Sequence, residues 1–349
     1  MDRLKERLGL IKNVVVILSG KGGVGKSSVS AVLATTLVKS GYRVGILDLD
    51  ITGPNIPRII GVPEKKILQS EKGWIPVYVD KEKKLGVISI GYLISKKDAV
   101  IWRGPRKHGI INQFLVDVNW GELDYLIIDT PPGTSDEHIS LVELLHKAIP
   151  TSTLNANISK LRIIAEEETL EEKTKLGAII VTTPQEVALI DIKKEINFCK
   201  KVNLEIIGLI ENMSGFLCPN CDEIHQIFSS GGGINLAKNL FINLLCKIPL
   251  DPRLVEICDK DGVKILLDEN NEKNKLGKPI LKAFDQVIEF VEEWSKDRES
   301  NTDSDGDDDE DDEDEDDELQ KLNDEEENKK KKQMLKRAKK RKKMESFDF

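Results

Sequence analysis

The sequence predicts an α/β fold in which a mostly parallel sheet is flanked by helices. Short runs rich in β-branched residues recur between turn residues, and they are apolar throughout, which is typical of strands buried on both faces. Helix-length segments separate many of these runs, and strands that alternate with helices favour parallel pairing with right-handed crossovers. The chain has 349 residues, 39% of them apolar, which is enough to bury a sizeable core.

The individual elements follow from the sequence in chain order. VVVILS at 14–19 is continuously apolar and predicts the first strand, and the glycine-rich stretch after it leads into a helix-prone run at 27–40. Near the end, LKAFDQVIEFVEEW at 281–294 spaces its apolar residues as in an amphipathic helix that closes the body. The other expected strands are 43–50, 84–91, 125–130, 178–183, 205–212 and 246–251, and the other expected helices include 184–200 and 231–245.

Composition divides the chain into a body at 1–296 and a charged tail at 297–349, which we expect to be disordered. Of the 16 residues in 303–318, 14 are acidic, and of the 15 in 329–343, 11 are basic, so neither block has the apolar surface that ordering requires. The tail holds 22 of the 61 acidic and 13 of the 52 basic residues, which leaves 39 of each in the body. The net charge of −9 therefore gives no support to direct binding of nucleic acid or of a membrane.

The sequence carries no signal for export or for membrane insertion. No stretch approaches the roughly 20 apolar residues of a membrane helix, and the start, MDRLKERLGLIKN, lacks the features of a signal or transit peptide. Five cysteines, an odd number, are more typical of reduced thiols or metal ligands than of a disulfide framework. We expect a cytoplasmic protein, with nuclear access if the basic run of the tail acts as an import signal; a solvated tail without a fixed partner is the alternative.

Residues 20–27, GKGGVGKS, match the phosphate-binding pattern G-x-x-x-x-G-K-[ST] between an expected strand and an expected helix. The glycines let backbone N–H groups close around phosphate oxygens, Lys26 reaches the β and γ phosphates, and the hydroxyl of Ser27 is a ligand for Mg²⁺. Lys21 is a second lysine that this chemistry does not require. The predicted nucleotide-binding residues of the loop are Gly20, Lys21, Gly22, Gly23, Val24, Gly25, Lys26, Ser27 and Ser28.

Acidic residues stand at the carboxyl ends of two expected strands, where open α/β sheets bind ligands. ILDLD contains Asp48 and Asp50, and LIIDTPPG places Asp129 where a carboxylate approaches the metal ion of the nucleotide, with Gly133 nearby for a mobile sensor of the γ phosphate. A buried acid at a strand end can also be purely structural, and that alternative stays open for Asp48. For Asp50 and Asp129 we expect a function.

Cys218-Pro-Asn-Cys221 places two thiols in a turn after an expected strand, where both can bind one metal centre. Structural zinc and iron–sulfur clusters each take about four ligands, so the pair is incomplete. Three completions are open: His225 with a distant cysteine, a metal-free redox disulfide, or a second copy of the motif across a two-fold axis. We favour the last, because symmetry supplies the two missing thiols. The other cysteines are expected to be small buried side chains; they are Cys199, Cys246 and Cys258.

Four segments, GKGGVGKS, LDLDITGPN, IIDTPPGTSDEH and ENMSGFLCPNC, together resemble the Mrp-type branch of the deviant-Walker-A P-loop ATPases, relatives of MinD and of nitrogenase iron protein. The similarity spans most of residues 10–265 and implies a P-loop NTPase fold with slow, dimer-dependent ATP hydrolysis. It implies that Lys21 reaches a nucleotide held by the other subunit and stabilises charge in the transition state. It further implies that Asp50 orients or deprotonates the attacking water and that Asn212 contacts adenine, although a cap or turn role is the alternative for Asn212.

ENMSGFLCPNC followed by GGG also resembles the eukaryotic cytosolic iron–sulfur scaffold ATPases, whose paired C-x-x-C motifs hold a 4Fe–4S cluster for transfer to apo-proteins. Those scaffolds combine a longer subunit, which has an N-terminal four-cysteine site, with a shorter one that lacks it. This chain has no cysteine before Cys199 and is similar to the shorter subunit.

This second resemblance implies the partners and cofactors of the chain. The partner is the longer subunit or a second copy, and apo iron–sulfur proteins are the recipients. The implied cofactors are ATP, Mg²⁺ and a 4Fe–4S cluster on Cys218 and Cys221. The alternative function is a metal-free switch of the MinD/ParA kind that positions or recruits a partner.

One segment departs from the family pattern. Residues 147–175 form a longer link than is expected between the helix after TPPGTSDEH and the strand at 178–183. We expect a surface insertion with a helical portion.

Overall fold

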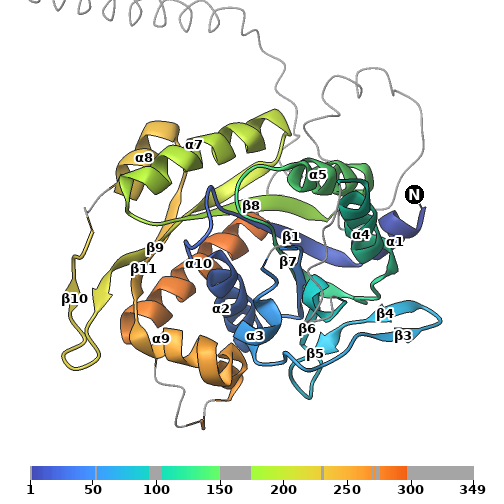
Figure 1. Ribbon diagram of the computed structural model, residues 1–349, viewed down its shortest axis with the longest axis horizontal. Helices are drawn as coiled ribbons and strands as arrows, with labels where there is room; N and C mark the ends of the chain where they lie inside the picture. The colour runs from blue at the N-terminus through green and yellow to red at the C-terminus, as the bar shows by residue number, and fades with distance from the viewer. Residues whose placement is uncertain are drawn as a thin grey trace, which may run out of the picture. The chain divides into compact units, whose positions relative to one another are not determined.

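A mostly parallel sheet of the expected kind lies at the centre of the protein (Figure 1). The computed structural model describes residues 2–51, 53–93, 104–149, 174–228, 232–268, 270–271 and 276–296. The main sheet has the strand order β10-β9-β8-β1-β7-β2-β6-β5, with β11 paired to β9, and β3 and β4 form a separate hairpin. The strands are β1 Ile11–Leu18, β2 Val44–Asp48, β3 Leu68–Ser70, β4 Gly73–Ile75, β5 Val77–Tyr78, β6 Leu85–Ser89, β7 Leu123–Asp129, β8 Lys175–Thr182, β9 Glu205–Leu217, β10 Ile224–His225 and β11 Leu244–Leu250.

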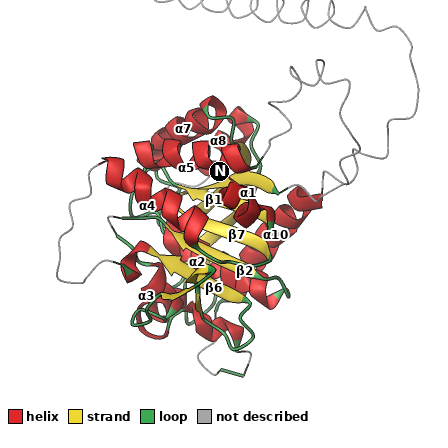
Figure 2. Cartoon of the chain, turned by 90° about the vertical axis from the view of Figure 1, so that its right-hand side faces the viewer, coloured by secondary structure: helices red, strands yellow, loops and turns green. Residues whose placement is uncertain are grey.

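Helices cover both faces of the sheet (Figure 2). Successive side chains of a strand point to opposite faces, so Val15 and Ile17 of β1 belong to one core and Val14 and Val16 to the other. The first core includes α2 and α10, and the second includes α1, α4, α5 and α7. Burial on both faces explains why the strand sequences are apolar throughout. The helices are α1 Asp2–Gly9, α2 Lys26–Lys39, α3 Ile56–Ile60, α4 Gly104–Asp117, α5 Asp136–Ala148, α7 Glu186–Lys201, α8 Gly232–Leu240, α9 Pro252–Glu256 and α10 Lys278–Lys296.

The strand ends that form the site come from β1, β7 and β2. Parallel pairing aligns Asp129 with Ile17 on one side and with Asp48 on the other. Because the carboxyl ends of parallel strands meet at one edge of the sheet, the loop after β1 and both acids lie together there.

All seven predicted strands are present, but two predicted boundaries differ from the structure by more than three residues. The helix predicted at 231–245 ends at Leu240, where Phe241 adopts a left-handed conformation with φ 53°, and the apolar run that follows is β11, paired in parallel with β9. The strand predicted at 205–212 continues to Leu217, because β10 pairs with its last two residues. β9 therefore runs through ENMSG to the cysteine motif.

The predicted insertion at 147–175 lies mostly outside the described residues. Lys147 and Ala148 complete α5 and Lys175 begins β8, so these ends belong to regular elements, while 150–173 is not described. The predicted tail at 297–349 also lies outside the described part of the chain. Among the described helices, each is too short or too polar to cross a membrane.

Candidate nucleotide site and cysteine hairpin

The loop between β1 and α2 leaves the first turn of α2 without a side-chain cap. Gly25 stands at the N-cap of α2 with φ 83°. The amide Nδ2 of Asn212 in β9 donates to the carbonyl of Val24 at 2.8 Å, and a Cβ at Gly25 would overlap that amide. Uncapped N–H groups and the helix dipole suit phosphate oxygens. Asn212 thus lies within β9 and holds the loop, rather than capping or turning the chain after the strand.

The carboxylate of Asp129 contacts three polar side chains at the start of α2. Its carboxylate lies 2.7 Å from the Nζ of Lys26, and it accepts hydrogen bonds of 2.7 Å from the hydroxyls of Ser27 and Ser30. Lys26 and Asp129 are both buried, so this ion pair is shielded from water. The sequence predicted Lys26, Ser27 and Asp129 as one site, and the structure brings them together. Ser30 was missed, although it lies one helical turn after Lys26.

The donor set around Asp129 fits a magnesium ion. The hydroxyl of Ser27 and the carboxylate of Asp129 are oxygen ligands of the kind that Mg²⁺ prefers, and Mg²⁺ commonly binds through one or two such groups plus phosphates and water. When bound, the ion would neutralise negative charge on the phosphates of the nucleotide.

Asp48 shapes the turn that presents Asp50. The Asp48 carboxylate is fully buried, accepts a 2.7 Å hydrogen bond from Ser89 Oγ and accepts a 3.1 Å bond from the backbone N–H of Asp50. Burial, and then the charge of Asp129, raise the pKa of Asp48 to about 8. Asp50 is half-buried beyond the strand end, and one of its oxygens accepts from the backbone N–H of Gly53 at 3.1 Å. Asp48 is therefore a positioning residue, and Asp50 stays a predicted catalytic one.

The two loop lysines have different environments. Lys26 is buried against Asp129, whereas Lys21 is half-buried at the rim, 3.5 Å from Gln185 Oε1 at the N-cap of α7. Gly22 and Gly23 beside Lys21 are exposed. Lys21 thus lies at the edge of its own loop, where the amine can turn toward another molecule.

The segment after β7 is tied to the loop by buried hydrogen bonds. Thr130 Oγ1 donates to Ile17 O, and the N–H of Gly133 donates to Ser19 O, each at 2.7 Å. Buried His138 in α5 contacts the other end of this segment. Its Nδ1 accepts a hydrogen bond from the N–H of Ser135 at 3.2 Å, and its Nε2 lies 3.1 Å from Pro131 O. This pattern requires a neutral ring with the proton on Nε2.

His138 should make the stability of the fold depend on pH. Burial lowers the pKa of His138 from 6.5 to about 4, so between these pH values the unfolded chain binds a proton that the folded chain does not. As the pH is lowered from 6.5 to 4, the free energy of unfolding should therefore decrease, by up to about 3 kcal/mol from this residue. Urea unfolding of the wild type and of His138→Gln across this pH range measures the effect as the difference between their free energies of unfolding. The difference is needed because the raised pKa values of Asp48 and Glu195 act in the opposite direction. Parallel pH profiles of the two proteins would refute this role.

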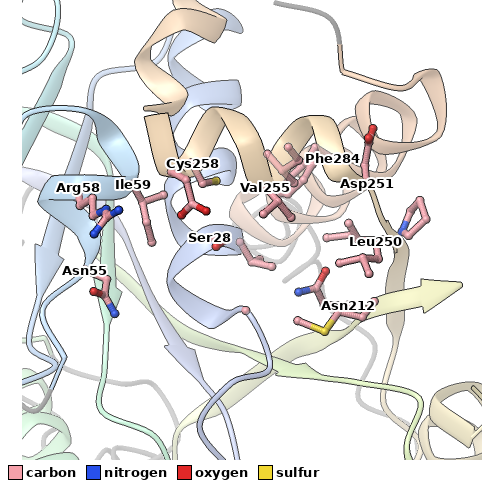
Figure 3. Close-up of a pocket in the computed structure, with 17 residues that line it drawn as sticks. Ser28, Asn55, Arg58, Ile59, Asn212, Leu250, Asp251, Val255, Cys258 and Phe284 are labelled. Carbon is pink, nitrogen blue, oxygen red and sulfur yellow. The ribbon is translucent and has the colours of Figure 1, made fainter. Parts of the chain in front are cut away.

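A cavity of about 410 Å³ opens beside the start of α2 (Figure 3). Gly25 lines this cavity. In Figure 3, Ser28 lies on the side of α2, Asn212 lies below, and Val255 and Cys258 lie above. The volume is that of a small-molecule site. Its other lining residues, which sequence reasoning missed, are Val29, Asn55, Arg58, Ile59, Met213, Ile248, Pro249, Leu250, Asp251, Leu254, Asp259 and Phe284.

Glu211 anchors the strand that links this cavity to the cysteines. It is fully buried, accepts a hydrogen bond of 2.6 Å from Ser214 Oγ and one of 2.8 Å from the N–H of Gly233, and lies 3.8 Å from the Nζ of Lys247. These contacts fix β9 against the start of α8 and against β11. The glutamate stands next to Asn212 in ENMSG, and sequence reasoning assigned it no role.

The cysteine motif forms the tip of the β9–β10 hairpin, which extends from the body at one end of the sheet (Figure 1). The Cys218 N–H donates to Glu223 O at 3.0 Å, and the Asp222 N–H donates to Cys218 O at 2.9 Å. The thiols are accessible, since Cys218 is half-buried and Cys221 exposed. Hydrogen bonds from the backbone N–H groups of Asn220 and Cys221 lower the pKa of Cys218. The pKa of Cys221 is raised despite a bond from the N–H of Glu223, because its thiol donates to Cys218.

Arg253 connects the hairpin tip to the cavity. Its guanidinium lies 3.0 Å from Asp222 Oδ1, next to Cys221, and its Nε donates to Asp251 Oδ1 at 2.9 Å. Asp251 is the N-cap of α9 and lines the cavity. One side chain therefore contacts both the cysteine turn and the wall of the cavity.

The remaining cysteines are buried, as predicted. Burial raises the pKa of Cys199 and Cys246 to about 12 and that of Cys258 to about 11, so these thiols stay protonated. Cys258 also lines the cavity.

Comparison with known proteins gives consistent matches. The family model described as "NUBPL iron-transfer P-loop NTPase" matches residues 10–288. The chain is 46% identical over 300 residues to "Cytosolic Fe-S cluster assembly factor CFD1" of Yarrowia lipolytica, covering 85% of this chain and 95% of the relative. It is 51% identical over 281 residues to "Cytosolic Fe-S cluster assembly factor NUBP2 homolog" of Dictyostelium discoideum, covering 80% and 95%.

Solved structures with the same fold include nucleotide complexes. The nucleotide-binding protein of Archaeoglobus fulgidus in complex with ADP has a TM-score of 0.60 and 32% identity, over 79% of this chain and 96% of that one. MinD of Pyrococcus horikoshii complexed with Mg-ADP has a TM-score of 0.52 and 21% identity, over 82% and 97%, which shows a shared fold.

Proposed function

The chain belongs to the NUBPL family of iron-transfer P-loop NTPases, and we propose that it is an ATP-dependent scaffold for a 4Fe–4S cluster, which it assembles and passes to apo-proteins in the cytosol. The names of its relatives, cytosolic Fe-S cluster assembly factors, support this role. Cys218 and Cys221 would hold the cluster as cargo. Mg-ATP would bind at the loop, with the base in the cavity beside Asn212.

The observation that carries this proposal is that one strand, β9, serves both sites. Its Asn212 side chain holds the phosphate loop, and the same strand ends at Leu217, immediately before the first cysteine. Cys218 lies six residues after Asn212, so at about 3.3 Å per residue at most about 20 Å of strand joins the two sites, and the bulge opposite β11 shortens it. Arg253 adds a second connection, from the cavity wall to the cysteine turn. A nucleotide that shifts these elements would alter how the hairpin meets its partner.

The hairpin requires a second subunit to complete the cluster. Two thiols are half of the roughly four ligands that a 4Fe–4S cluster takes. The partner would be the longer scaffold subunit or a second copy of this chain, and the exposed hairpin tip leaves both thiols accessible to it. A metal-free positioning switch would need neither cysteine.

Anaerobic reconstitution with iron and sulfide tests the proposal. We expect the broad visible absorption of an iron–sulfur cluster and transfer of that cluster to an apo-ferredoxin. A protein that stays colourless after iron and sulfide are supplied would contradict it.

Lys21 would act on the nucleotide of the partner subunit and stabilise charge that develops during hydrolysis. Lys21→Ala should leave ATP binding intact and lower turnover about 100-fold, the effect of removing one transition-state donor. Lys193→Ala, which removes an exposed lysine of α7, is the matched control.

A mixing experiment separates action across the interface from action within one chain. A one-to-one mixture of Lys21→Ala and Lys26→Ala chains should recover about a quarter of wild-type turnover, because half of the pairs are mixed and each has one intact site. A mixture no more active than its components would refute the role in trans.

A further inference from the structure

The hairpin carries more potential metal ligands than its two cysteines. Cys221, Glu223 and His225 place one ligand atom each within 4.8 Å of one another, and all three are exposed. Of the three, only His225 lies in β10, and Asp222 has a left-handed φ of 56°, so the turn itself brings the three side chains together. Cys218 lies beside this group, because its backbone N–H donates to Glu223 O at 3.0 Å and its carbonyl accepts from the Asp222 N–H at 2.9 Å.

The neighbouring side chains support this choice of ligands. Asp222, between Cys221 and Glu223, is paired with Arg253 at 3.0 Å and points to a different contact. The backbone bonds between Cys218, Asp222 and Glu223 hold the turn that brings both thiols together. Four ligands, two sulfur, one nitrogen and one oxygen, are therefore available on one short segment of a single chain.

The spacing fits a tetrahedral ion after a small movement. Ligand atoms around an ion with bonds of about 2.0–2.3 Å lie about 3.3–3.8 Å apart. The separations of up to 4.8 Å among Cys221, Glu223 and His225 therefore need to close by about 1 Å. Exposed side chains can make such a movement by rotation, without a change of the backbone.

We propose that the hairpin of one chain binds a single divalent transition-metal ion through Cys218, Cys221, His225 and Glu223. Two thiolates with an imidazole and a carboxylate select a borderline cation, Zn²⁺ or Fe²⁺, over Mg²⁺ and Ca²⁺. The inference goes beyond the proposed scaffold function and shares only the two cysteines with it. All four ligands come from one chain, so the lone hairpin would hold its ion without a second subunit.

Cobalt(II) is the probe, added under anaerobic conditions to the full chain at a concentration where sizing shows a monomer. We expect one Co²⁺ per chain, with the visible bands of tetrahedral cobalt and thiolate-to-metal charge transfer in the near ultraviolet. His225→Ala should weaken binding at least about 100-fold, since loss of a mere outer-shell partner already costs 10–100-fold. Glu223→Gln should weaken it about tenfold. Displacement by Zn²⁺ and by Fe²⁺ then shows which of the two ions the site prefers.

Matched controls are available on the body. His108→Ala and Glu256→Gln change exposed residues of α4 and α9 and should leave cobalt binding unchanged. Unchanged affinity and spectrum in both His225→Ala and Glu223→Gln would overturn the proposal, as would a stoichiometry of one Co²⁺ per two chains. Either result leaves cluster reconstitution unaffected, whereas a failure of the scaffold function would appear as loss of the cluster with cobalt binding intact.

Discussion

Lys26→Ala is expected to abolish ATP binding. The Lys26 ammonium is buried and lies 2.7 Å from Asp129, at the start of α2, whose uncapped N–H groups would face the phosphates. Without Lys26, the nucleotide loses its main cationic contact. Its phosphates are then repelled by the buried carboxylate of Asp129, which has Asp48 as a neighbour. Removal of one partner of a buried ion pair also costs about 3–5 kcal/mol of folding stability. The melting temperature of wild type should rise with Mg-ATP, and that of the variant should not.

Two further variants separate the loss of binding from the loss of stability. Lys26→Ala combined with Asp129→Asn removes the unpaired charge, so it should recover stability but not ATP binding. Lys39→Ala removes an exposed lysine at the other end of α2 and should behave as wild type. A Lys26→Ala chain that Mg-ATP stabilises as strongly as wild type would overturn the assignment of this loop.

Cys218→Ala is expected to eliminate the iron–sulfur cluster. Of the two cysteines, Cys218 has the lowered pKa and is therefore the better thiolate ligand. A cluster shared by two subunits would lose one thiolate from each of them and keep only two of its four protein ligands. The residue is half-buried at a hairpin tip, so the change should alter the free energy of unfolding by less than about 0.5 kcal/mol. Iron and sulfide analysis after anaerobic reconstitution measures the loss.

Cys246→Ala is the control for this experiment, since it removes a buried thiol of β11 and should leave the cluster content unchanged. Retention of a full cluster in Cys218→Ala would show that other residues hold the iron.

The seven predicted strands could be recognised because most of their residues are buried on both faces of the sheet, which gives continuous apolar runs in the sequence. The same property caused the error at 231–245, where the apolar residues of α8 and β11 follow one another and both fit a helical period. Only the left-handed turn at Phe241 and the pairing with β9 separate them. The hairpin of β3 and β4 was missed because it is short and Leu68 is exposed, so it has no apolar pattern to detect.

The site was predictable where its chemistry lies in contiguous motifs. Lys26, Ser27 and Asp129 follow from patterns that fix residue type and spacing, and the structure brings them within hydrogen-bonding distance. The cavity wall around Val255 and Cys258 was not predictable, because its apolar residues resemble any other core positions and only tertiary packing places them beside Asn212. Gln185, which contacts Lys21, is likewise distant in sequence and part of no motif.

The central claim is that the active unit contains two subunits, each of which brings half of the cluster ligands and a lysine for the other's nucleotide. Native mass spectrometry of the reconstituted, ATP-loaded protein tests it directly. We predict one 4Fe–4S cluster per two subunits, present only in species with the mass of a pair. A single chain that carries a complete 4Fe–4S cluster and hydrolyses ATP at the full rate would contradict the claim.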